Sequence, residues 1–171
     1  MIACFLPDAA STDALGAVLA HTQPAQAIVH LHGDLGAGKS TLARAWLRAL
    51  GVGGAIRSPT YTLVEHYPLA GGGKALHLDL YRIAGAGELE FLALDDAGAT
   101  LWLVEWPERA AGALPDADLR VELAVDGDGR TVRLVGTTPT GIDWLGRVSK
   151  TGACDALLTH RGRKSSQPTD I

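Results

Sequence analysis

Residues 26–50 read Gln26-Ala-Ile-Val-His-Leu-His32, then Gly33-Asp-Leu-Gly-Ala-Gly-Lys-Ser40, then Thr41-Leu-Ala-Arg-Ala-Trp-Leu-Arg-Ala-Leu50. The middle segment fits the pattern G-x-x-x-x-G-K-[ST] of a phosphate-binding P-loop. The short apolar run before it predicts a strand, and the apolar residues at helical spacing after it predict a helix. Glycines let several backbone N–H groups of the loop face one anion, and the helix brings its positive end to the same point. This stretch therefore predicts an α/β fold with a phosphate site at the loop.

Two side chains of the loop have expected roles at that site. Lys39 would reach the β- and γ-phosphates of a nucleotide, and the Ser40 hydroxyl would ligate Mg²⁺. The glycines do not fall as G-x-G-x-x-G, so the pattern does not favour a dinucleotide site.

The composition is that of one globular domain. The chain has 171 residues, 47% of them apolar, and a net charge of −4, which argues against a broad nucleic-acid-binding surface. Cys4 and Cys154 lie far apart in sequence and suggest neither a disulfide framework nor a metal site, which fits a reducing cytoplasm. We find no signal-peptide pattern and no apolar run of membrane-spanning length, so we expect a cytoplasmic protein without a membrane segment.

The rest of the chain predicts further strands and helices around the loop. Strands are expected at 2–6, 60–67, 74–80, 100–105, 120–125 and 131–135, and helices at about 11–21, 88–94, 107–111 and 142–148. Asp126-Gly-Asp-Gly129 predicts a tight hairpin between the last two strands. We expect one domain over 1–148, and a polar, basic and disordered tail over 149–171.

Two carboxylates end predicted strands, as a P-loop site requires for Mg²⁺ and for the attacking water. Glu105 follows the nearly all-apolar strand, which is typical of a strand covered on both faces, and is the preferred metal carboxylate. Asp79 would then orient water or give the metal a second support. The alternatives are that Asp79 caps a loop or pairs with Arg82, and that Glu105 is a helix N-terminal acid before Pro107.

Other polar and aromatic residues allow two interpretations each. The segment Ser58-Pro-Thr60 is either a switch that senses a γ-phosphate or simple turn chemistry. Trp106 is either a core residue or a flat surface near the nucleotide. His66 and His77 are interpreted as ordinary polar residues of strands.

Five motifs occur in one order along the chain. They are Gly33 to Ser40, Ser58-Pro-Thr-Tyr-Thr-Leu-Val64, Leu78-Asp-Leu-Tyr-Arg82, Glu88-Leu-Glu-Phe91 and Val104-Glu-Trp-Pro107. In this order and spacing they resemble the TsaE family, the small bacterial ATPase required for threonylcarbamoyladenosine modification of tRNA. The resemblance covers roughly residues 6–135. Its departure in the P-loop is Ser40, where the family usually has threonine, and the hydroxyl is kept.

The resemblance implies a fold and an activity. The fold would be a mostly parallel central sheet flanked by helices, with a C-terminal antiparallel hairpin. The protein would bind Mg²⁺-ATP and hydrolyse it slowly alone, as a monomer. Its partners would be TsaD and TsaB, which transfer a threonylcarbamoyl group to the adenosine beside the anticodon. Hydrolysis would reset that complex for another turnover, and tRNA would be met only through the complex.

The resemblance also carries roles onto matching positions. Lys39 would bind phosphates and support catalysis, Ser40 and Glu105 would hold Mg²⁺, and Asp79 would support hydrolysis with Thr60 in the switch. The residues expected to contact the nucleotide are Gly33, Asp34, Leu35, Gly36, Ala37, Gly38, Lys39, Ser40, Thr41, Trp106, Arg130 and Ser11.

Three rival classes share a P-loop. They are a small-molecule kinase, a GTP-dependent switch and a nucleotide-binding module without hydrolysis. A kinase usually has a lid with several arginines, and no such compact segment is evident here. The chain contains no asparagine, so the guanine-reading motif Asn-Lys-x-Asp is absent and adenine is expected.

Overall fold

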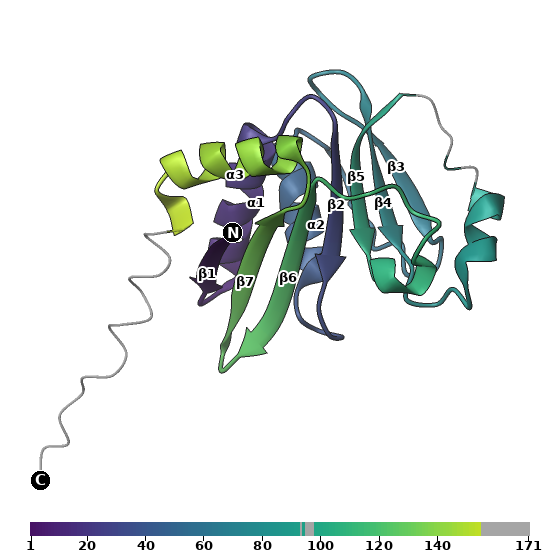
Figure 1. The fold of residues 1–171 in the computed structure, drawn as a ribbon, viewed down its shortest axis with the longest axis horizontal. Coiled ribbons are helices and arrows are strands. Elements are labelled where there is room, and N and C mark those ends of the chain that lie inside the picture. The colour runs from purple at the N-terminus through teal and green to yellow at the C-terminus, as the bar shows by residue number, and fades with distance from the viewer. Residues whose placement is uncertain (93, 95–97, 155–171) are drawn as a thin grey trace, which may run out of the picture.

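A single sheet organises the protein, which we describe from a computed structural model over residues 1–92, 94 and 98–154. Its strand order is β1-β7-β6-β2-β5-β4-β3 (Figure 1). The strands are β1 (Ile2–Leu6), β2 (Ala27–His32), β3 (Val64–Pro68), β4 (Lys74–Asp79), β5 (Ala99–Glu105), β6 (Leu119–Asp126) and β7 (Gly129–Gly136). The four central strands β6, β2, β5 and β4 are parallel, and antiparallel strands complete both edges. The predicted α/β fold with a C-terminal hairpin is confirmed.

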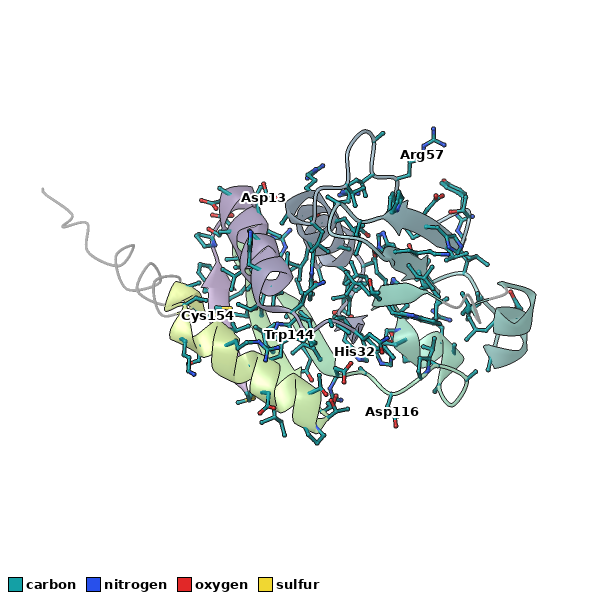
Figure 2. All side chains as sticks on the ribbon, turned by 90° about the horizontal axis from the view of Figure 1, so that it is seen from above. Asp13, His32, Arg57, Asp116, Trp144 and Cys154 are labelled. Atoms are coloured by element: carbon teal, nitrogen blue, oxygen red, sulfur yellow. The ribbon has the colours of Figure 1, made fainter. Side chains whose placement is uncertain are left out.

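Three α-helices share one hydrophobic cluster with the sheet in the described part of the chain. They are α1 (Ala9–Thr22), α2 (Lys39–Ala49) and α3 (Pro139–Lys150). The indole rings of Trp46 on α2 and Trp144 on α3 meet edge to face, with centroids 5.6 Å apart. Figure 2 labels Trp144. Both side chains are fully buried, and burying an aromatic side chain stabilises a fold by roughly 1.5–3 kcal/mol. This cluster fixes α2, and with it the P-loop, against the sheet.

The other face of β4 and β5 carries a second cluster. Along β4, Leu76 and Leu78 point to this cluster, because alternate residues of a strand face opposite sides. Two short 3-10 helices, η1 (Ala86–Leu92) and η2 (Pro107–Ala110), contribute Leu89 and Ala110 to it. Since β4 and β5 are covered on both faces, Glu105 and Asp79 end buried strands, as the apolar run before Glu105 predicted.

Two predicted elements begin elsewhere in the structure. Helix α1 begins at Ala9 rather than near Ser11, because Asp8 caps it by accepting a hydrogen bond from the Ser11 N–H at 2.8 Å. The strand predicted from Thr60 begins at Val64, and residues 59–62 form a turn. The Leu63 N–H closes that turn on the Pro59 carbonyl at 2.7 Å, with Leu63 at a φ of +65°. Turn formation therefore overrides the β-type composition of this segment.

The C-terminal helix is longer than the sequence predicted. It begins at Pro139, because Thr138 caps it by accepting from the Gly141 N–H at 3.1 Å, and it ends at Lys150. Packing continues to Cys154, whose sulfur lies 3.3 Å from that of Cys4 in the core beside the N-terminal strand (Figure 2). The packed body thus extends past the predicted boundary at 148, and residues 155–171 of the predicted tail lie outside the described residues.

In the ranges that the structure describes, no helix has the length and apolar content required to cross a membrane.

Candidate functional site

The P-loop occupies residues 33–38, between the end of β2 and the start of α2. Gly33 has a φ of +143°, and a β-carbon there would collide with the Leu123 carbonyl oxygen of β6. Gly38, the residue before α2, has a φ of +107°, which side-chain-bearing residues rarely adopt. The loop therefore needs glycine at both positions to turn from the strand into the helix.

Lys39 is held inside the loop although it is charged. Its Nζ donates to the carbonyl oxygens of Gly33 at 2.7 Å and Asp34 at 3.0 Å, and lies 3.9 Å from the centre of the Trp106 ring. Burial lowers the pKa of the Lys39 ammonium, and the nearby Glu105 and Asp79 carboxylates oppose that shift. The loop thus holds a desolvated cation at the start of α2.

Ser40 and Glu105 come together from different elements. The Ser40 hydroxyl on α2 donates to Oε2 of Glu105 at the end of β5 over 2.8 Å. Its single proton is used in that bond, so the oxygen lone pairs remain for another partner. The pairing of β4 with β5 places Asp79 directly beside Glu105, which brings both predicted carboxylates to one place.

Asp79 connects this place to the turn at 58–60. Thr60 Oγ1 donates to Asp79 Oδ2 at 2.9 Å, and the Tyr81 N–H donates to Asp79 Oδ1 at 3.1 Å. Since the Thr60 proton goes to Asp79, the 2.8 Å contact between the Ser58 and Thr60 hydroxyls has Ser58 as donor. The predicted switch residues therefore contact the predicted catalytic carboxylate.

His77, interpreted from the sequence as an ordinary polar strand residue, has a charged partner in the interior of the sheet. His77 is fully buried, and its Nε2 lies 2.7 Å from Glu105 Oε1. Leucine and polar residues alternate along β4, so His77 lies on the same face as Asp79. This alternation is the sequence signal that links His77 to the site.

These groups surround a cavity of about 300 Å³. Residues of the loop and the start of α2 line one side, and Ser58, Thr60, Asp79, Glu105 and Trp106 line the rest. Trp106 lines the cavity and also packs against the second cluster, so each of its two interpretations describes part of its surroundings. Arg44 and Tyr81 also line the cavity, although neither was predicted to lie there.

A second cavity, of about 310 Å³, lies on the other side of the P-loop. It shares Gly36, Gly38 and Thr41 with the first, and Arg130 from the hairpin lines it. The N-terminal segment reaches it through Asp8 and Thr12, whereas the Ser11 hydroxyl donates to Asp8 Oδ1 at 2.7 Å. The two cavities together offer space on both sides of the loop.

A third cavity, of about 590 Å³, has no P-loop residue in its wall. It is lined by His30 and His32, which alternate with the buried Val29 and Leu31 of β2 and so face away from α1 and α2. Burial lowers the pKa of both imidazoles. The phosphate-binding geometry lies at the smaller cavities, so we place the candidate site there.

The donor set around Ser40 suits a magnesium ion that arrives with phosphates. Among the described residues no group of three or more His, Cys, Asp or Glu side chains has the arrangement of a metal site. Mg²⁺ is usually held by one or two carboxylates together with substrate phosphates, rather than by a cage of protein ligands. Ser40 and Glu105 supply the hard oxygen atoms for that kind of binding.

Comparisons with known proteins identify one family. A sequence model of the family described as "Threonylcarbamoyl adenosine biosynthesis protein TsaE" matches residues 6–132. Two similar chains are both named "tRNA threonylcarbamoyladenosine biosynthesis protein TsaE". The one from Haemophilus influenzae is 46% identical over 71% of this chain and 77% of its own length. The one from Streptomyces coelicolor is 39% identical over 76% of this chain and 91% of its own length.

A solved structure shares the fold. The crystal structure of YdiB from Bacillus subtilis superposes with a TM-score of 0.73, covering 88% of this chain and 95% of the other, at 23% identity. At 23% identity, this structural match shows a shared fold and nothing further. The family match spans most of the chain and contains the whole P-loop site, and we conclude that this chain belongs to the TsaE family.

Proposed function

We propose that this protein binds Mg²⁺-ATP at the P-loop and hydrolyses it slowly, in support of tRNA threonylcarbamoyladenosine biosynthesis. The observation that carries the proposal is the 2.8 Å hydrogen bond from Ser40 to Glu105. It joins the hydroxyl of the loop to a buried carboxylate at a strand end, which is the pair of groups that P-loop hydrolases use beside the phosphates. Family membership supports the biological process.

The residues at the loop would bind the phosphates. Lys39 would exchange its hydrogen bonds with Gly33 and Asp34 for phosphate oxygens, and the N–H groups of the loop would add further donors. Ser40 and Glu105 would hold Mg²⁺, which when bound neutralises phosphate charge. The buried setting of Lys39 supports this role, because desolvated charge interacts more strongly with an anion than charge in water.

Asp79 would act on the water that attacks the γ-phosphorus. Thr60 and the Tyr81 N–H each donate to one of its oxygens, which fixes the carboxylate plane. Each carboxylate oxygen can accept more than one hydrogen bond, so Asp79 can still accept one from water. The products are ADP and free phosphate. Thr60 would transmit the state of the γ-phosphate to the 58–60 turn.

The second cavity would take the nucleoside. Arg130 and Thr12 line it beside the glycines of the loop, whereas Asp79 lines the first cavity. The absence of asparagine from the chain favours adenine over guanine.

The partners in this proposal are TsaD and TsaB. ATP binding would promote assembly with them, and hydrolysis would release the assembly for another turnover, with tRNA reached through the complex. Because tRNA modification acts on cytoplasmic tRNA, the proposal places this protein in the cytoplasm.

The test follows phosphate from ATP labelled at the γ-position. We expect slow release of free phosphate that requires Mg²⁺, rises when TsaD and TsaB are added and is lost in Glu105→Gln. An exposed acid offers the matched control, since Asp143→Asn on the surface of α3 removes the same charge far from the loop. Transfer of label to a metabolite would indicate a kinase, and binding without any release would indicate a module that does not hydrolyse ATP. Either result contradicts the proposal.

A further inference from the structure

His77 lies in the interior of the sheet, behind the proposed metal carboxylate. It is on β4, two residues before Asp79, and none of its side chain is exposed. Its Nε2 lies 2.7 Å from Glu105 Oε1 on the neighbouring strand, while the other oxygen of Glu105 accepts from Ser40 at 2.8 Å. The Glu105 carboxylate is therefore held from two elements, β4 on one side and α2 on the other.

The hydrogen-bond pattern defines which ring nitrogen donates. An ionised carboxylate only accepts, so Nε2 of His77 carries the proton in this contact. Nδ1 of His77 is buried and has no hydrogen-bond partner among the described residues. A buried ring with one unsatisfied nitrogen lowers stability relative to an apolar side chain of similar size. Packing of the sheet therefore does not account for a histidine at this position.

The contact restricts a motion that matters for metal binding. The terminal torsion of a glutamate is broad and roughly two-fold, so an unrestrained Glu105 carboxylate would rotate between orientations. A hydrogen bond to one oxygen selects one orientation and leaves the other oxygen directed at Ser40. Partners behind a ligand group commonly orient it in this way in metal sites.

We propose that His77 is a positioning residue, which presents Oε2 of Glu105 to Ser40 and to the Mg²⁺ of the bound nucleotide. The inference rests on the proposed function, because that function assigns Glu105 to the metal. His77 does not reach the cavity and touches no substrate. Its effect is to arrange Glu105 before Mg²⁺-ATP arrives.

The test compares three substitutions at His77. In His77→Gln the amide nitrogen stands near the position of Nε2 and can still donate to Glu105. In His77→Asn the amide nitrogen reaches only the position of Nδ1, and in His77→Leu no donor remains. The affinity for ATP is measured calorimetrically for each protein in excess Mg²⁺ and again in excess EDTA.

Mg²⁺ should tighten ATP binding by the wild-type protein. His77→Leu and His77→Asn should lose roughly 10- to 100-fold of the Mg²⁺-dependent affinity, as substitutions behind a metal ligand usually do, while affinity in EDTA stays within about 3-fold. His77→Gln should restore the Mg²⁺-dependent affinity to within about 3-fold of wild type.

The possible failures can be told apart. If Mg²⁺ does not tighten ATP binding by the wild-type protein, the proposed Mg²⁺-ATP site itself is wrong. If the wild type depends on Mg²⁺ and His77→Leu keeps the same dependence, the positioning role is wrong. Equal losses in Mg²⁺ and in EDTA, or a His77→Gln protein no better than His77→Leu, would also overturn it, because His77 would then support only the general shape of the site.

Discussion

The hydroxyl of Thr60 donates a 2.9 Å hydrogen bond to Oδ2 of Asp79, and this contact joins the 58–60 turn to the end of β4. Thr60 and Asp79 belong to different motifs of the sequence and are 19 residues apart. In the proposed function Thr60 senses the γ-phosphate and Asp79 orients water, so this hydrogen bond would couple the two roles.

The first prediction concerns that hydrogen bond. Thr60→Val keeps the shape of the side chain and removes the donor, so it should slow ATP hydrolysis by about 10-fold or more, the range expected for losing a hydrogen bond to a charged group. ATP affinity should change little, because the Lys39 site is intact. Single-turnover hydrolysis and calorimetry measure the two quantities. Thr60→Ser keeps the hydroxyl and is the control, and equal rates for Thr60→Val and wild type would disprove the coupling.

The second prediction concerns the buried cation. Lys39→Ala removes a charged donor to the phosphates and should weaken Mg²⁺-ATP binding by roughly 10- to 100-fold, the affinity equivalent of one charge-assisted hydrogen bond. Lys150→Ala removes an exposed charge at the end of α3 and should bind as wild type does. Calorimetric titration with Mg²⁺-ATP measures the affinity of both variants and of the wild type. An unchanged affinity in Lys39→Ala would remove this side chain from phosphate binding.

Much of this site was accessible from the sequence, because its residues belong to motifs with local geometry. The order of strand, glycine loop and helix placed Lys39 and Ser40, and the positions of Asp79 and Glu105 at strand ends placed both carboxylates. These inferences needed only periodicity and loop chemistry. The register of β4 against β5, which sets Asp79 beside Glu105, depends on pairing across the sheet and was not predicted.

The remaining differences came from contacts between distant segments. Thr60 was expected in a strand, but its hydrogen bond to Asp79 belongs to a turn closed by Pro59 and Leu63. His77 was passed over because a polar residue in an alternating strand usually faces solvent. Here its face of β4 carries Ala75 into the cluster beneath the α-helices, and Glu105 is its partner. Cys4 and Cys154 are 150 residues apart in sequence and meet in the core. No local pattern encodes such a meeting.

The third prediction concerns the packing of α1 on α2, which positions the P-loop helix. A β-carbon on Gly16 would stand 2.7 Å from the Ala45 β-carbon and 2.9 Å from the Trp46 nitrogen, so Gly16→Ala should lower the free energy of unfolding by about 1–3 kcal/mol. Gly146 lies in α3 with open space around it, so Gly146→Ala should raise the free energy of unfolding by about 0.5–1 kcal/mol. Urea denaturation measures both, and stabilisation by Gly16→Ala would contradict the close approach of the two helices.

The fourth prediction concerns the pH dependence of stability. Burial and the nearby His32 lower the pKa of His30, while Asp116 opposes the shift. Below the ordinary imidazole pKa of about 6.5 the unfolded chain therefore binds more protons than the folded one, and acid destabilises the protein through this group. The loss of stability between pH 7 and pH 5 should be smaller in His30→Gln than in wild type. Denaturation at the two pH values tests this, and an equal or larger loss in His30→Gln would show that His30 is not responsible.

The last prediction addresses the whole account through the formation of threonylcarbamoyladenosine. In a reaction reconstituted from TsaD, TsaB, tRNA and the activated threonylcarbamoyl donor with Mg²⁺-ATP, modified tRNA is counted per TsaD over many turnovers. With the wild-type protein we expect product to accumulate well beyond one per complex. With Asp79→Asn, which should still bind ATP, product should stop near one per complex. Multiple turnovers that proceed equally well with Asp79→Asn, or without this protein, would contradict the proposal that ATP hydrolysis at this P-loop resets the modifying complex.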